Sequence, residues 1–86
     1  MRLVELNENE YDYLTSSKDF LSKGLLTKII DSSEKMPFKY ILRLPEEDID
    51  ELRDLCGDQL QIVGFDKDYS LTLEGRILEV LIDKFF

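Results

Sequence analysis

The sequence predicts a small single-domain α+β fold, in which a sheet of about three strands packs with three or four helices in the order β-α(α)-β-α-β-α. Short apolar runs at residues 2–6, 38–44 and 60–65 are typical of strands. Residues 20–30 and 73–86 repeat their apolar positions every three or four residues, as amphipathic helices do. A chain of 86 residues has room for one core, so we expect one domain over its whole length.

The region between residues 8 and 33 is expected to be helical, as one kinked helix or as two. Asn7 or Asn9 can cap its start, because an asparagine side chain accepts hydrogen bonds from the free N–H groups of a first turn. Ser16, followed three residues later by Asp19, resembles a capping box, so a second helix can start there.

A strand over residues 38–44 is expected to follow this helical region. Pro37 separates the two, because a proline disfavours helical geometry at the residue before it. Alternation divides the side chains of a strand between two faces of a sheet. One of these faces is expected to carry Phe38, Tyr40, Leu42 and Leu44.

The most acidic stretch of the chain covers residues 44–58. It holds seven carboxylates and one cation, Arg53, and so carries −6 of a total net charge of −8. Pro45 suits the first position of a helix and Gly57 the residue after its end, which predicts a short helix over residues 46–56. The residues expected on its inward edge are Ile49, Leu52, Leu55 and Cys56.

Six of these carboxylates are expected to face outward and bind a partner. Positions 47, 51, 54 and 58 share one face of a helix, because they are three or four residues apart, and positions 46 and 50 lie beside them. Such a face either solubilises a protein or docks a basic partner, and a metal site built from carboxylates is a third interpretation. The predicted partner-binding residues are Glu46, Glu47, Asp50, Glu51, Asp54 and Asp58.

The last helix is expected to run from Leu73 to Phe86 behind the cap Thr72. Its polar residues form a narrow stripe, and almost every other position is apolar. A helix that is apolar over so wide an arc is central to the core or is also buried against a partner. A homodimer is therefore an open alternative.

The C-terminal part of the chain also contains the run Leu71-Thr72-Leu73-Glu74-Gly75-Arg76, preceded by the expected strand and a polar turn. This run resembles the end of winged-helix regulators, where a wing strand leads into the last helix. The resemblance implies a helix-turn-helix whose second helix enters the major groove. Here the only helix in that place is the most acidic segment, which phosphate would repel, so the resemblance implies at most a degenerate module without DNA binding.

Composition argues against several classes of function. The chain has no histidine, which excludes His-based catalysis and His metal ligands. The single cysteine, Cys56, cannot form an intramolecular disulfide, which fits a reducing cytoplasm, and it is expected to be a small core residue. A pI near 4.4 opposes binding to nucleic acid or to anionic membranes. No signal peptide or membrane span is expected, because no apolar stretch is long enough.

One acidic turn begins like a calcium-binding loop, with Asp66 and Asp68 at its start. The loop positions that require a glycine and a bidentate acid hold Leu71 and Ile77 instead. A polar turn is therefore expected here. No catalytic residue, cofactor or metal site is predicted.

Together these observations predict a non-enzymatic cytoplasmic interaction protein that presents residues 46–56 to a basic protein. An immunity or antitoxin-like protein that masks the basic site of a nuclease is a concrete example. Its aromatic anchors would come from Tyr11, Tyr13 or Tyr69. The first alternative is a homodimeric structural or regulatory subunit that uses residues 73–86, and a weaker one is an enzyme that uses carboxylates with a divalent metal.

Overall fold

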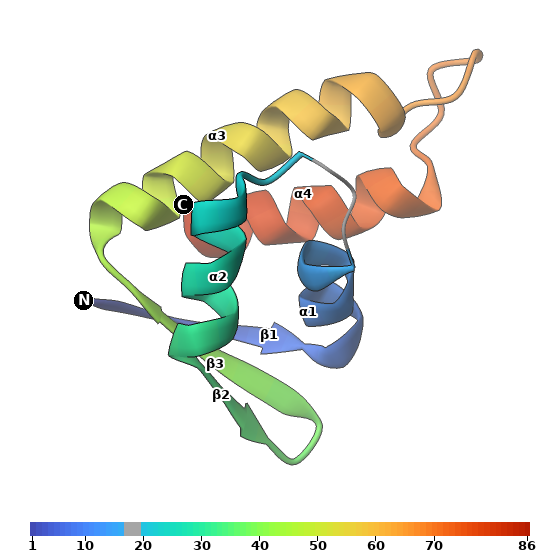
Figure 1. Ribbon diagram of the computed structural model, residues 1–86. Coiled ribbons are helices and arrows are strands. Elements are labelled where there is room, and N and C mark those ends of the chain that lie inside the picture. The colour runs from blue at the N-terminus through green and yellow to red at the C-terminus, as the bar shows by residue number, and fades with distance from the viewer. Residues whose placement is uncertain (17–19) are drawn as a thin grey trace.

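The computed structural model describes residues 1–16 and 20–86 and confirms the α+β class (Figure 1). Within these residues a three-stranded antiparallel sheet is combined with four helices in the order β-α-α-β-β-α-α. The elements are β1 (Arg2–Asn7), α1 (Glu8–Thr15), α2 (Lys23–Ser32), β2 (Ser33–Met36), β3 (Lys39–Leu44), α3 (Glu46–Val63) and α4 (Leu73–Phe85).

Strand β3 lies between β1 and β2 and pairs antiparallel with both. Leu42 at its centre is opposite Val4 of β1 and Ser33 of β2. Because side chains alternate across a strand, this register places Val4, Leu6, Leu42 and Leu44 on one face of the sheet, and all four are buried. The opposite face is exposed to solvent and carries cross-strand ion pairs.

Two separate helices, α1 and α2, occupy the region between residues 8 and 33. The predicted cap Asn7 begins α1, and its side chain accepts a backbone N–H of the first turn. Ser22 caps α2 in the same way. The alternative start at Ser16 is wrong, because this residue ends α1, and its expected partner Asp19 lies outside the described residues.

The predicted strand at residues 60–65 is wrong, because helix α3 continues to Val63. The expected helix end at Gly57 is wrong for the same reason: this glycine lies inside the helix and does not have a positive φ. Leu60 and Val63 extend the apolar row of α3 and pack against the core, which stabilises helical geometry over the whole segment.

The third strand is β2, a polar segment in which the sequence has no apolar alternation. Near the predicted wing only an isolated bridge joins Phe65 to Leu71. The segment that the winged-helix resemblance requires as a wing strand therefore belongs mostly to a helix. The order of elements also differs from that of a helix-turn-helix followed by a wing.

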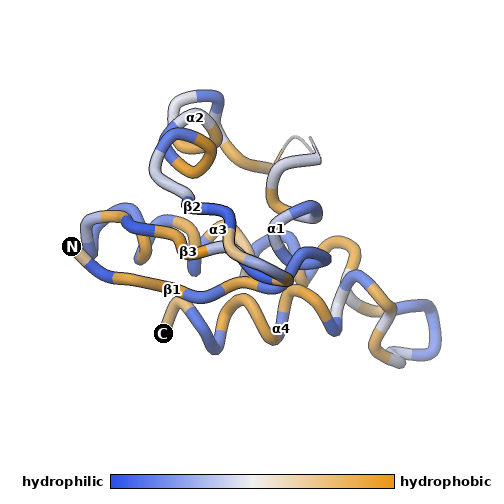
Figure 2. Tube along the Cα trace, turned by 90° about the horizontal axis from the view of Figure 1, so that it is seen from below, coloured by the Kyte–Doolittle hydropathy of each residue, from blue (hydrophilic) through white to orange (hydrophobic). Residues whose placement is uncertain are grey.

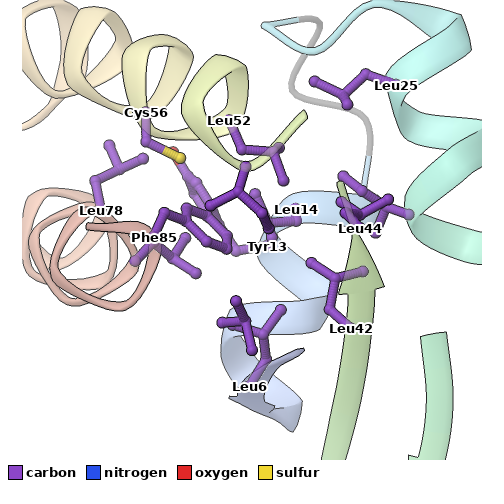
Figure 3. Packing of buried hydrophobic residues seen from close by; sticks show 14 residues of the cluster. Leu6, Tyr13, Leu14, Leu25, Leu42, Leu44, Leu52, Cys56, Leu78 and Phe85 are labelled. Atoms are coloured by element: carbon purple, nitrogen blue, oxygen red, sulfur yellow. The ribbon is translucent and has the colours of Figure 1, made fainter. Parts of the chain in front are cut away.

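The core lies where the buried face of the sheet meets the helices (Figure 3). Leu6 and Leu42 reach it from the sheet, Leu52 from α3 and Phe85 from α4, and each is fully buried. Helices α3 and α4 pack along each other, and hydrophobic and hydrophilic residues alternate around α4 (Figure 2). The structure thus confirms that the last helix is part of the core, while its other side faces outward.

The β2–β3 hairpin corrects the prediction for Phe38, which was expected to share one face of the strand with Tyr40, Leu42 and Leu44. Met36 pairs with Lys39, so Pro37 and Phe38 form a two-residue turn. Phe38 has a φ of 68° and is 85% exposed. Proline fixes the first turn position, and the second then needs the positive φ that glycine adopts most easily.

We expect Phe38→Gly to raise the free energy of unfolding by about 0.5–1 kcal/mol, because relief of the left-handed conformation outweighs the entropy that glycine adds to the unfolded chain. Urea denaturation followed by circular dichroism measures the change. Phe38→Ala is the control, since it removes the ring but keeps the Cβ that causes the strain. An equal gain in both variants would show that the exposed ring, and not the backbone, is responsible.

Cys56 is fully buried on the side of α3 that faces α4, as expected for a small core residue (Figure 3). Burial raises the pKa of its thiol from 9.0 to about 12. The folded protein therefore holds this proton more tightly than the unfolded chain between these pH values. In this window the free energy of unfolding falls as pH rises, by at most about 1.4 kcal/mol per pH unit.

We expect the free energy of unfolding to decline above about pH 9, more steeply in the native protein than in Cys56→Ala. Burial also raises the pKa of Tyr13 above its ordinary value of 10.0, so part of the decline persists in the variant. Urea denaturation at several alkaline pH values measures the two slopes. Parallel slopes would contradict a buried, protonated thiol.

Candidate functional site

Helix α3 begins directly after strand β3 and carries the acidic segment. The carbonyl oxygen of Pro45 accepts the N–H groups of Asp48 and Ile49 at 3.0 and 3.1 Å, which closes the first turn. Three acids occupy this turn, where the positive end of the helix dipole favours negative charge. The first turn therefore tolerates its charge, but the carboxylates farther along the helix lack this compensation.

One side of α3 faces the core. Ile49, Leu52 and Cys56 are fully buried there, and the half-buried Leu60 and Val63 continue the same row. This side packs along α4, and Leu52 points into the core that α3 shares with the sheet (Figure 3), which fixes the rotation of the helix about its axis. The opposite side must therefore face solvent.

Four carboxylates stand on that solvent side and form a continuous row, which we name the acidic ridge: Glu47, Glu51, Asp54 and Asp58. Each residue turns an α-helix by about 100°, so these positions cluster opposite the buried row. All four are exposed, and none makes an ion pair with any residue in the described ranges. The row runs from residue 47 to residue 58, a rise of about 16 Å along the helix.

The two other predicted partner-binding residues lie on the flank of this row and have partners within the chain. Glu46 lies 3.8 Å from a guanidinium nitrogen of Arg2. Asp50 lies 3.5 Å from a guanidinium nitrogen of Arg53, one turn along the helix. The six predicted residues thus share one exposed helix, but only the four of the acidic ridge are without an ion pair among the described residues.

The seventh carboxylate of the segment, Asp48, faces inward and was not expected to do so. It is 8% exposed, and the Lys28 ammonium on α2 lies 3.3 Å from it. This pair fastens the start of α3 to α2. The four-residue spacing from Asp48 to the buried Leu52 was a signal for its orientation, but no sequence pattern indicated the lysine.

Of the three tyrosines proposed as aromatic anchors, only Tyr69 is available on the surface, at 87% exposed. Tyr11 stacks on Tyr40 with ring centroids 3.7 Å apart, and its hydroxyl is hydrogen bonded to Ser33. Tyr13 is buried and donates a hydrogen bond to a carboxylate of α4. The rings of Tyr11 and Tyr13 thus make contacts within the protein and are unsuitable as anchors for a partner.

The acidic turn after α3 is held by hydrogen bonds from backbone N–H groups to the side chain of its first aspartate. The Asp66 carboxylate accepts the N–H groups of Asp68 and Ser70 at 2.8 and 3.0 Å, which is the arrangement of a polar turn.

Over the described part of the chain, no group of three or more histidine, cysteine or acidic side chains is arranged to hold a metal ion. Among the same residues, no helix is long and apolar enough to cross a membrane.

Comparison with known proteins gives no relative. No family model, no curated protein and no solved structure matches the chain. Function is therefore inferred from the surface of the molecule alone.

Proposed function

We propose that the protein is a non-enzymatic binding protein that docks a cationic partner protein along the acidic ridge. The observation that supports this most is the row of four exposed carboxylates on the outermost side of α3, without an ion pair to any described residue. Like charges three or four residues apart cost a helix about 0.2–0.5 kcal/mol per pair. A partner that supplies cations relieves this repulsion.

The chemistry of the ridge favours a partner whose basic surface otherwise binds phosphate. Carboxylates at regular intervals along about 16 Å of helix offer a cationic cleft a series of negative charges. Such surfaces steer association and make it sensitive to salt. An immunity or antitoxin-like protein that covers the basic site of a nuclease fits this description.

A pulldown at low salt tests the proposal. We expect Glu51→Lys with Asp54→Lys to weaken capture of the partner at least tenfold, because attraction becomes repulsion at the centre of the ridge. The control is Glu79→Lys with Asp83→Lys, which makes the same charge change at two exposed positions of α4. If the ridge variant retains every partner of the native protein, the proposal is wrong.

A second candidate function is a homodimer formed through α4. Phe85 is fully buried, but Phe86, Leu73 and Val80 are exposed, by 81%, 80% and 44%. These residues favour a further contact of the helix beyond the core. Analytical ultracentrifugation tests it: a dimer that dissociates in Val80→Lys supports this function, and a monomer at high concentration removes it.

A further inference from the structure

An open hollow of about 380 Å³ adjoins the first residues of the acidic ridge. It lies between α2, the end of β3 and the start of α3, and Glu47 belongs both to its wall and to the ridge. Hollows of this size accept a single side chain or a small ligand. Its wall includes Thr27, Lys28 and Asp31 of α2, Arg43 and Leu44 of β3, and Pro45.

The lysine and the arginine in this wall are both paired with carboxylates of the chain. The ammonium of Lys28 lies 3.3 Å from the buried Asp48. The guanidinium of Arg43 lies 3.1 Å from Glu34. An anionic ligand would have to compete with these two carboxylates for the same cations.

Two carboxylates in the wall remain, Asp31 from α2 and Glu47 from α3. Both are exposed, and neither forms an ion pair within residues 1–16 and 20–86. Leu44 and Pro45 give the same hollow an apolar wall. The hollow therefore combines apolar surface with two exposed carboxylates that have no ion pair among the described residues.

We infer that this hollow receives one long cationic side chain, a lysine or arginine, of the protein that docks on the acidic ridge. Such side chains bury an aliphatic stem against apolar surface and keep their charge at the rim, where Asp31 and Glu47 lie. A side chain held in a pocket contributes more to affinity than the exposed ion pairs around it. The inference rests on the proposed function, because it assigns the anchoring residue of the same partner.

The test uses a tetra-arginine peptide as the probe and the 86-residue chain, with affinity measured by calorimetry at low salt. Thr27→Trp fills the hollow without changing any charge, and we expect it to weaken binding at least fivefold. Ser70→Trp, which adds the same ring to an exposed loop, is expected to leave binding unchanged. Asp31→Asn removes one carboxylate without adding bulk and is expected to weaken binding two- to fivefold.

Each result separates the inference from the proposed function. If Thr27→Trp and Asp31→Asn bind the peptide as tightly as the native protein, while Glu51→Lys with Asp54→Lys does not, the hollow is not an anchoring site but the ridge still binds cations. If the native protein does not bind the peptide, or if the ridge variant also binds it normally, both ideas fail. Saturable binding of inorganic phosphate that Thr27→Trp abolishes would identify an anion site and overturn the inference.

Discussion

Gly75→Ala is expected to destabilise the protein by about 3 kcal/mol or more, through overpacking at the junction of α3 and α4. Gly75 lies in the first turn of α4 against the backbone of Gly64. A Cβ on Gly75 would clash with the carbonyl oxygen of Gly64 and would lie 2.9 Å from its Cα and 2.8 Å from Leu71 Cδ1. Backbone atoms cannot move aside without separating the two helices.

Gly57→Ala is the matched control, because a Cβ there meets nothing within 4 Å. Alanine inside a helix is favoured over glycine, so this variant is expected to gain about 0.5–1 kcal/mol. Urea denaturation of both variants gives the comparison. A loss of stability in Gly57→Ala would contradict the continuation of α3 through this residue, and native stability in Gly75→Ala would contradict the close approach of the two helices.

Lys84→Met is expected to cost about 2–4 kcal/mol, because it leaves a buried carboxylate without its charged partner. The Glu10 carboxylate, whose side chain is 5% exposed, lies 2.6 Å from the ammonium of Lys84 and also accepts the N–H of Asn7. The pair connects the start of α1 to the end of α4. The loss is measured by urea denaturation at neutral pH.

The double variant Glu10→Gln with Lys84→Met serves as the control for this effect. A glutamine keeps an oxygen for the N–H of Asn7 but carries no charge, so the double variant is expected to recover part of the lost stability. If Lys84→Met alone is as stable as the native protein, the ion pair contributes nothing. If the double variant is less stable than the single one, the unpaired charge is not the cause of the loss.

Features that depend only on residues close together in the sequence were predictable. The caps at Asn7 and Thr72 are confirmed, because an N-cap needs only its own side chain and the next turn of backbone. The shared outer face of Glu47, Glu51 and Asp54 follows in the same way from helical periodicity. These parts of the fold and of the candidate site are set by residues within one or a few helical turns of each other, so the sequence alone predicts them.

The errors arise where distant segments decide the structure. The apolar run at residues 60–63 fits a strand as well as a buried helix, and the packing of α4 along α3 selects the helix. Strand β2 is polar and forms because β3 pairs with it. Lys28 of α2 contacts Asp48 of α3, and the hollow lies beside this contact. Because strands β2 and β3 separate the two helices in the sequence, no local sequence pattern could predict either feature.

The most direct test of the central claim measures the dissociation constant of the captured partner with the native protein and with Glu51→Lys plus Asp54→Lys, at low and at physiological salt. If the acidic ridge is the docking surface, the native protein binds more weakly as salt rises, and the variant loses at least tenfold in affinity at low salt. Glu79→Lys with Asp83→Lys should behave as the native protein does. Equal affinities for all three proteins, insensitive to salt, would contradict the claim.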